Sequence, residues 1–300
     1  MQLALKIAHH DHAYIERRGG HVLYSYMRQA SARSACRQAA IERAFARWLE
    51  ASTGDQRLPS LSGLGLIVMQ RAFFAAEDLG RLLAALDDEP SWERLTDATL
   101  PELDAIFTRV MTDPNRSLRP FILPTGEQLL DEDLDRTARE GVLRLAQLAA
   151  ERWIRQLETV VRFWVTARSF AKATMHGFPL IAGSLVTGPP PAGALTDRLR
   201  IPDCPSWALA LVSDMDHQQQ RVETTLIPIP LDEKALSAAV RAGKAATRVT
   251  DALAEAQATS IEGGYAITVP LGLIHRLSDE QRTAVEQASQ AQPKRGDSDE

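Results

Sequence analysis

Three basic residues of this chain have the spacing of a small anion-binding site on one helix. Arg168, Lys172 and His176 follow one another at intervals of four residues, which places them on one face of a helix that Gly177 and Pro179 end. The pattern has two interpretations. Cations at the carboxyl end of a helix are stabilised by its macrodipole, by about 0.3 to 1 kcal/mol each. Alternatively, the three side chains bind an anion or the backbone of RNA, with the imidazole of His176 as a proton donor near neutral pH.

A further basic residue, Arg162, lies within the apolar residues 160–165 of the same segment. A guanidinium that is buried in such surroundings requires a carboxylate or several carbonyl groups as partners, because its desolvation is otherwise too costly. Glu77 and Asp78, in a second apolar segment, are the natural partners. We therefore predict that Arg162 is a buried polar residue, either as one half of a structural ion pair or as part of a polar site within a helical bundle.

The densest group of metal-ligating residue types lies near the start of the chain, where Asp11 stands among His9, His10 and His12. A transition-metal site needs three or four ligands that converge in space. Neighbouring side chains of an extended segment point in opposite directions, so only His10 and His12 share a face, and His21 joins them only across a hairpin. We interpret the group as solvent-exposed and predict no metal and no other cofactor.

The sequence carries none of the common catalytic motifs. It has no glycine-rich phosphate loop followed by Lys and Ser or Thr, no His-Glu-x-x-His, no Gly-x-Ser-x-Gly and no dinucleotide fingerprint after a strand. No catalytic residue can therefore be assigned, and the common enzyme classes are less favoured than a binding function.

Apolar residues recur at helical spacing in the segments that must position these side chains, which are 32–51, 61–86, 102–111, 127–176, 232–258 and 279–290. Residues 127–176 predict one long helix, or two coaxial helices, buried on every side near residues 160–165. Residues 115–126 predict a connecting loop, because two prolines and a glycine interrupt them. The last segment begins with a capping box formed by Ser278 and Gln281.

Residues 32–51 predict an amphipathic helix with an arginine-rich outer face. The residues expected to face the core are Ala35, Ala39, Phe45 or Ala46, and Leu49. The residues expected on the outer face are Arg33, Arg37, Arg43 and Arg47.

Short strands are predicted where apolar or β-branched residues are bounded by Gly or Pro, at 178–186, 207–212, 221–227 and 265–269. The predicted fold class is mainly α, a helical bundle followed by a small α+β portion with a short antiparallel sheet. The predicted organisation is a hairpin or frayed helix in residues 1–30, the bundle in 31–177, the α+β portion in 178–291 and a disordered tail in 292–300.

Composition argues against both a membrane-spanning protein and a general nucleic-acid binder. The apolar runs are too short to cross a bilayer, and a formal net charge of -5 opposes binding to a phosphate backbone. The charge is unevenly placed, since residues 1–50 carry eight basic and four acidic side chains, whereas residues 77–104 carry two basic and nine acidic ones. This asymmetry fits self-association, a contact between the first two helical segments, or two solvated helix faces.

The two cysteines, Cys36 and Cys204, cannot form a disulfide framework and lack the paired spacing of a zinc site. We expect both to be reduced and half-buried. The first residues also lack the apolar core of a secretory signal, so we predict a cytoplasmic protein with no membrane contact.

Residues 163–177, a helix rich in aromatic residues that ends in Met-His-Gly, resemble the closing helix of HEPN-type helical bundles. The resemblance covers residues 60–177. It implies a bundle related to nucleic-acid-targeting toxins and phage-defence proteins, or to inactive relatives that serve as binding modules. Active members have Arg, then four to six residues, then His. In this sequence the positions at that spacing before His176 are Ser169, Phe170 and Ala171, and Arg168 lies one residue too far from His176. The resemblance therefore implies an inactive, dimerising relative.

These observations together predict a non-catalytic protein-interaction or scaffold module. Its partner is expected to be another protein or a second copy of the chain in a homodimer. The alternative is a nucleic-acid-processing protein of the toxin or defence type, which would use Arg168, Lys172 and His176.

Overall fold

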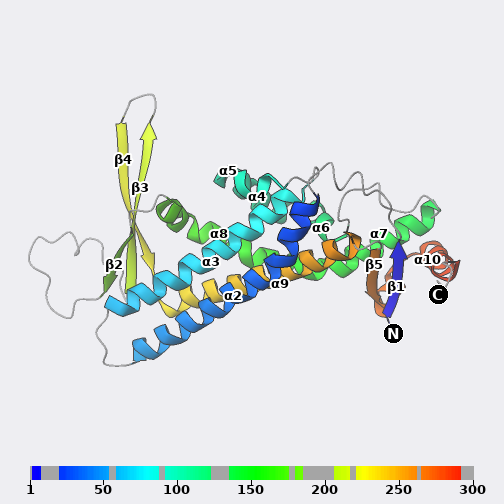
Figure 1. Cartoon of the computed structure of the whole chain (residues 1–300), viewed down its shortest axis with the longest axis horizontal. Helices are drawn as coiled ribbons and strands as arrows, with labels where there is room; N and C mark the ends of the chain where they lie inside the picture. The colour runs from blue at the N-terminus through cyan, green and yellow to red at the C-terminus, as the bar shows by residue number, and fades with distance from the viewer. Residues whose placement is uncertain are drawn as a thin grey trace, which may run out of the picture. The chain divides into compact units, whose positions relative to one another are not determined.

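The computed structural model of this chain describes residues 2–7, 20–53, 59–87, 92–122, 135–175, 180–184, 206–216, 221–261 and 265–291. Helices dominate these residues, so the prediction of a mainly α protein is confirmed (Figure 1). The α-helices are α2 (Gly20–Thr53), α3 (Pro59–Ala85), α4 (Arg94–Asp97), α5 (Leu100–Thr112), α6 (Pro114–Ile122), α7 (Arg136–Ala150), α8 (Ile154–Met175), α9 (Glu233–Ile261) and α10 (Asp279–Ala291). Two 3-10 helices are η2 (Glu151–Trp153) and η4 (Leu271–Arg276).

Local capping explains why several helices begin where they do. The amide of Ala235 donates to Oδ1 of Asp232 at 2.7 Å, which satisfies a free donor in the first turn of α9. In α10 the predicted capping box is present, because the amide of Gln281 donates to Oγ of Ser278 at 3.2 Å and the Ser278 amide donates back to Oε1 of Gln281 at 3.4 Å. Pro101 lies in the first turn of α5, as proline prefers.

The predicted loop at residues 115–126 is wrong, because α6 occupies Pro114–Ile122. Asp113 ends α5 and also begins α6: its Oδ1 accepts from the amide of Arg116 at 3.2 Å, and its carbonyl accepts from the amide of Ser117 at 3.3 Å. Proline ends one helix but is well placed in the first turn of the next, so Pro114 is equally a start signal.

Within their described part, residues 127–176 form two successive helices, so of the two predicted arrangements the single long helix is wrong. The single 3-10 turn η2 joins α7 to α8, and residues 127–134 and 176 lie outside the described residues. Trp153 in η2 and Ile154 pack against the small core cluster of Leu118 and Ala150.

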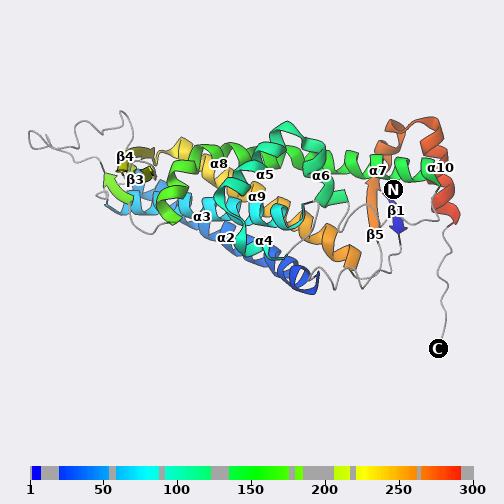
Figure 2. The same ribbon diagram turned by 90° about the horizontal axis from the view of Figure 1, so that it is seen from above.

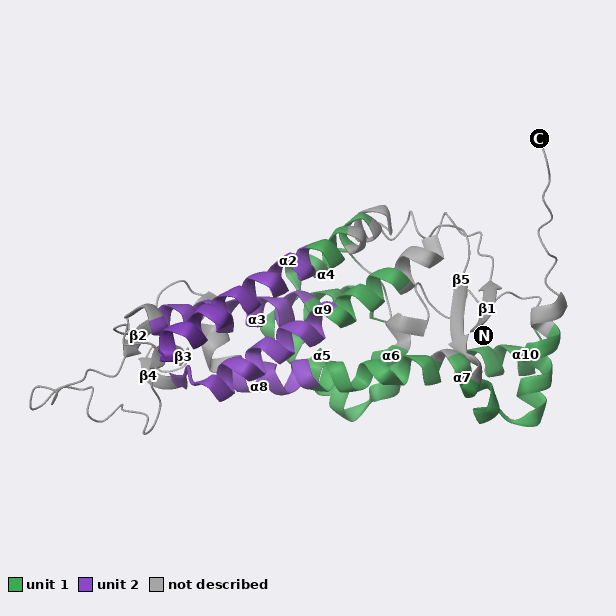
Figure 3. Cartoon of the chain, turned by 90° about the horizontal axis from the view of Figure 1, so that it is seen from below, with its two compact units in different colours: residues 1–32, 79–158, 248–300 green, residues 33–78, 159–247 purple. Residues whose placement is uncertain are grey.

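The chain divides into two compact units that are discontinuous in sequence (Figure 3). Unit 1 consists of Met1–Ala32, Leu79–Glu158 and Arg248–Glu300, and unit 2 consists of Arg33–Asp78 and Thr159–Thr247. The boundaries drawn from the sequence at residues 30 and 177 stay predictions, and the tail 292–300 lies outside the described residues.

In unit 2, helices α2, α3, α8 and α9 lie side by side (Figure 3). The ring of Phe73 on α3 stacks on Trp164 of α8 with the ring centroids 4.8 Å apart. On α9, a Cβ atom at Gly243 would lie 2.8 Å from Cδ1 of Ile41, so α2 and α9 are in direct backbone-to-side-chain contact.

The face of α2 that enters the core differs from the predicted one. Ile41, Ala44 and Trp48 are buried. Of the predicted core residues, Ala35 and Ala46 are exposed, and Ala39, Phe45 and Leu49 are only partly buried. Alanine gains little from burial, so the larger isoleucine and tryptophan determine how the helix is rotated.

The prediction that residues 160–165 are buried on every side is also wrong. Val160, Phe163 and Trp164 are buried, but the side chain of Val165 is 66% exposed and Arg162 is exposed too. Residues three apart share a helix face, so these two residues form an outward stripe on α8.

In unit 1, α10 packs on α7 and α3 packs on α5 at glycine positions. A Cβ atom at Gly141 would lie 2.7 Å from Cγ2 of Val285, and one at Gly80 would lie 3.1 Å from the ring of Phe107. Both pairs of helices therefore approach closely because one partner lacks a side chain.

Two sets of strands are described. In unit 1, β1 (Gln2–Ile7) pairs antiparallel with β5 (Tyr265–Pro270), with Gln2 opposite Pro270 (Figures 1 and 2). In unit 2 the strand order is β2 (Leu180–Ser184), β3 (Ser206–Asp216) and β4 (Arg221–Pro230), with antiparallel neighbours. Within residues 1–30, helix α2 begins at Gly20, and residues 8–19 lie outside the described residues.

Candidate functional site

The basic stripe predicted at the end of the central helix is placed only in part. Arg168 and Lys172 both belong to α8 and lie four residues apart in it. Their side chains, and His176 as a whole, lie outside the described residues. An anion-binding site formed by these three residues therefore stays a prediction.

Arg162 is not the buried polar residue that was predicted. It is exposed on α8, because residues 160, 161, 163 and 164 take up the buried side of this turn and leave position 162 facing outward. A guanidinium in water needs no buried counter-ion, so the reason for expecting a site inside the bundle is removed.

Asp78, one of the two expected partners, pairs with Arg37 of α2 instead. The Arg37 guanidinium also donates to the carbonyl of Phe74 at 3.0 Å. Arg37 therefore joins α2 to α3 and is only partly exposed, unlike the exposed Arg43 and Arg47 of the same helix. The other expected partner, Glu77, is buried.

The histidine group near the start of the chain cannot be placed. His9, His10 and His12 lie outside the described residues, whereas His21 lies within α2 and so does not belong to a hairpin. In the part of the chain that the structure describes, no three His, Cys, Asp or Glu side chains converge as a metal site would need.

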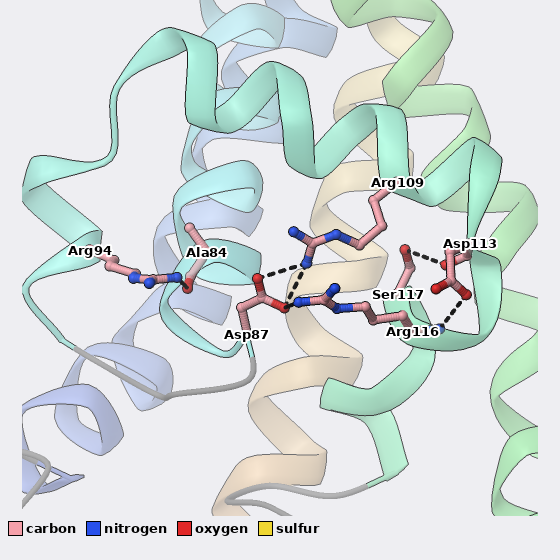
Figure 4. Close-up of polar contacts among 7 residues, drawn as sticks. All are labelled: Ala84, Asp87, Arg94, Arg109, Asp113, Arg116 and Ser117. Carbon is pink, nitrogen blue, oxygen red and sulfur yellow. Dashed lines mark hydrogen bonds and ion pairs between the residues drawn. The ribbon is translucent and has the colours of Figure 1, made fainter.

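A carboxylate between two guanidinium groups joins three helices of unit 1 (Figure 4). Asp87 follows the end of α3, and both of its oxygens accept from Nη1 of Arg109 on α5 at 2.7 Å. Nη2 of Arg116 on α6 lies 3.7 Å from Oδ1 of the same carboxylate. Close by, Nη1 of Arg94 donates to the carbonyl of Ala84 at 3.4 Å.

This junction has the chemistry of a structural clamp. The guanidinium groups of Arg109 and Arg116 donate hydrogen bonds and have no acceptor atom, so both face the carboxylate as donors. The Asp87 side chain is 17% exposed, which strengthens the ion pair relative to a surface pair. Asp87 therefore holds the end of α3 against α5 and α6.

A second polar network joins α2 to α9 in unit 2. The amide of buried Gln38 donates to Oε1 of Glu42 at 3.0 Å, and Nζ of Lys244 lies 3.1 Å from the same oxygen. The hydrogen bond from Gln38, followed by that from Lys244, lowers the pKa of Glu42 below its ordinary value. Both interactions favour the charged carboxylate, so this network is a helix-to-helix contact that depends on the ionisation of Glu42.

Two arginines lie on the same side of α2, on its outer face. Arg43 and Arg47 are exposed and four residues apart, and neither forms an ion pair with any residue that the structure describes. Small side chains surround them, because Ala46 is exposed and Ala39 is partly exposed. We call Arg43, Arg47 and the alanines beside them the α2 basic face.

Exposed Cys36 lies on the same side of α2, which corrects the expectation that it is half-buried. It stands seven residues before Arg43, and residues seven apart share a helix face. Cys204 lies outside the described residues.

An exposed turn in unit 1 is acidic, so its charge is opposite to that of the α2 basic face. Glu93 and Asp97 are exposed, and the amide of Asp97 donates to the carbonyl of Glu93 at 3.0 Å, so the two carboxylates stand one helical turn apart. The indole of Trp92 beside them is 41% exposed, which is unusual for so large an apolar group. We call these three residues the α4 acidic turn.

The two units differ in the sign of their exposed charge. Among the described side chains, unit 2 exposes eight Lys or Arg and three Asp or Glu, whereas unit 1 exposes seven and twelve. Uneven charge was predicted from the sequence, but its division between compact units could not be, because each unit combines distant segments.

Within the described ranges, no helix combines the length and the apolar character needed to cross a membrane. Comparison with known protein families, curated proteins and solved structures finds no match to this chain. No finding therefore bears on the HEPN resemblance, and the function has to be argued from the residues themselves.

Sequence reasoning missed the Asp87 clamp and the exposed Trp92. Asp87 belongs to an acidic run whose members look alike in sequence, and only the fold shows that Arg109 and Arg116 converge on this one. Trp92 had one available signal, because it lies two residues after Pro90 and directly before Glu93, outside any apolar periodic segment.

Proposed function

We propose that this chain is a non-catalytic protein-interaction module that associates with itself, most simply as a homodimer. The observation that carries the proposal is the separation of exposed charge between the two units. Surfaces of opposite sign on one polypeptide attract each other between copies, which speeds encounter and selects orientation.

The use of polar side chains in the described helices supports a binding role. Asp87 with Arg109, Arg37 with Asp78 and Glu42 with Lys244 all join one helix to another. These ionic groups therefore hold helices together.

The direct test is the mass of the full chain in solution, measured by sedimentation equilibrium over a hundredfold range of concentration. We expect a reversible rise from monomer to dimer. A strict monomer at the highest concentration, purified from its native host without a bound protein, contradicts the proposal.

The alternative function, processing of nucleic acid, rests on the spacing of Arg168, Lys172 and His176. The same purification tests it, because RNA bound at the stripe raises the absorbance ratio at 260 to 280 nm. Arg168→Glu with Lys172→Glu should remove that RNA, and Arg136→Glu with Arg144→Glu on α7 is the matched control.

The proposal also covers the small sheet, the family relationship and the cellular location of the protein. We propose that β2, β3 and β4 build a small antiparallel sheet, and that the bundle is an inactive, dimerising relative of HEPN-type proteins. We also propose that the protein works in the cytoplasm, since an exposed thiol at Cys36 persists most readily in a reducing compartment.

A further inference from the structure

We infer that the α4 acidic turn of one copy docks on the α2 basic face of a second copy, an inference that rests on the proposed self-association. Glu93 and Asp97 pair with Arg43 and Arg47 of the second copy. Trp92 lies beside these pairs and is covered by the contact.

The spacing of the charges supports this pairing. Arg43 and Arg47 are one helical turn apart, and so are Glu93 and Asp97, as the hydrogen bond from the Asp97 amide to the Glu93 carbonyl shows. Side chains at this separation have Cβ atoms roughly 6 Å apart. Two ion pairs can therefore form at once without distorting either helix.

The surroundings of the two arginines allow a close approach. Ala39 and Ala46 present only methyl groups, so the arginine side chains rise from a low surface. Exposed Trp92 adjoins Glu93 in the sequence, and an indole beside an arginine gains a cation–π interaction as well as apolar contact. Docking would thus cover the large aromatic ring that unit 1 leaves in water.

A second copy fits this face better than a nucleic acid does. Glu42 and Glu50 are exposed on α2 within three residues of Arg43 and Arg47, and they repel a phosphate backbone. A partner that carries two carboxylates on one short turn can contact the two arginines without lying over Glu42 and Glu50. The α4 acidic turn of a second copy is such a partner. A contact between unlike surfaces of identical copies closes into a dimer when each copy offers both surfaces to the other.

A charge-swap experiment tests the inference. Variant A carries Arg43→Glu and Arg47→Glu, variant B carries Glu93→Arg and Asp97→Arg, and the dissociation constant of each is measured by sedimentation equilibrium. Each variant alone should associate about tenfold or more weakly than the wild type. An equimolar mixture of A and B should recover wild-type affinity, because both contacts are then again between opposite charges.

A control with the same change of charge uses Arg71→Glu and Arg241→Glu, two exposed arginines of unit 2 on other helices. It should change the dissociation constant by less than about threefold at 150 mM salt, where the Debye length is about 8 Å. Unfolding curves of all variants establish that they are folded.

The outcomes separate the two proposals. If the wild type does not associate, the proposed function fails together with the inference. If the wild type associates and variants A and B do so equally well, only the docking inference is overturned. Recovery in a chain that carries all four changes, without recovery in the mixture, also overturns it, since the pairing would then lie within one copy.

Discussion

Gly243 on α9 stands so close to Gln38 on α2 that a Cβ atom at this position would lie 2.6 Å from the Gln38 Oε1. Real Cβ atoms essentially never lie so close to a neighbour, so a side chain at residue 243 would require the ends of Gln38 and Ile41 to move. The same Gln38 orients Glu42 through its amide, which makes this glycine the point where packing and the polar network of unit 2 meet.

Gly243→Ala should destabilise the protein by about 1 to 3 kcal/mol, because the added methyl group must displace Gln38 or separate α2 from α9. Chemical denaturation gives the free energy of unfolding. Gly63→Ala on α3 is the matched control: nothing lies within 4 Å of a Cβ there, so alanine should stabilise the helix by up to about 1 kcal/mol. Equal effects of the two substitutions would show that the close approach is absent.

Asp87→Asn should cost about 1 to 3 kcal/mol, because Arg109 and Arg116 are left without the carboxylate that holds them together in a partly buried position. Calorimetric or denaturant unfolding measures the loss. Arg136→Gln removes an exposed pair with Glu140 and should change stability by less than about 0.5 kcal/mol. A loss at Asp87 no larger than this control would mean that the clamp does not hold the helices.

The pKa of Glu42 is lowered in the folded chain, so its contribution to stability is present above the ordinary value of 4.5 and is lost as the pH falls through the folded value. The Glu42 side chain is 46% exposed, so solvent screening keeps the effect below about 1 kcal/mol. We expect Glu42→Gln to be less stable than the wild type at pH 7, and the difference to shrink as the pH falls below 4.5. A gap between the two proteins that stays constant over this range contradicts the assignment.

Cysteine labelling checks the rotation of α2. In a chain whose own cysteines are replaced by serine, Ala46→Cys should react with a thiol reagent at the rate of a free thiol. Ala44→Cys should react at least about tenfold more slowly, because the side chain of Ala44 is buried and becomes accessible only on opening. If Ala44→Cys reacted faster than Ala46→Cys, the buried face of α2 would be the one predicted from the sequence.

The starts of helices such as α5 and α10 could be predicted because their signals are local. Ser278 and Gln281 satisfy each other's backbone donors within one turn, and the sequence alone predicts their capping box. Asp113 followed by Pro114 shows the limit of such signals, since the same pair ends one helix and begins the next.

The partners of charged side chains could not be predicted in the same way. Arg162 was expected to meet Glu77 or Asp78, but it faces water, and Asp78 pairs with Arg37. One residue of rotation about a helix axis moves a side chain by 100°, so a small error in the assumed face exchanges buried and exposed positions.

By itself, then, the sequence determined the mainly helical character, the ends of helices such as α3, α5 and α10, and the uneven charge, because spacing, capping and charge act over a few residues. Only the tertiary structure decided which side of α2 and α8 is buried and which arginines meet Asp87 and Asp78. Those contacts join residues that are 22 to 41 positions apart, so they depend on how large buried side chains, such as Phe107 in unit 1 and Trp48 and Trp164 in unit 2, pack the helices of each unit against one another.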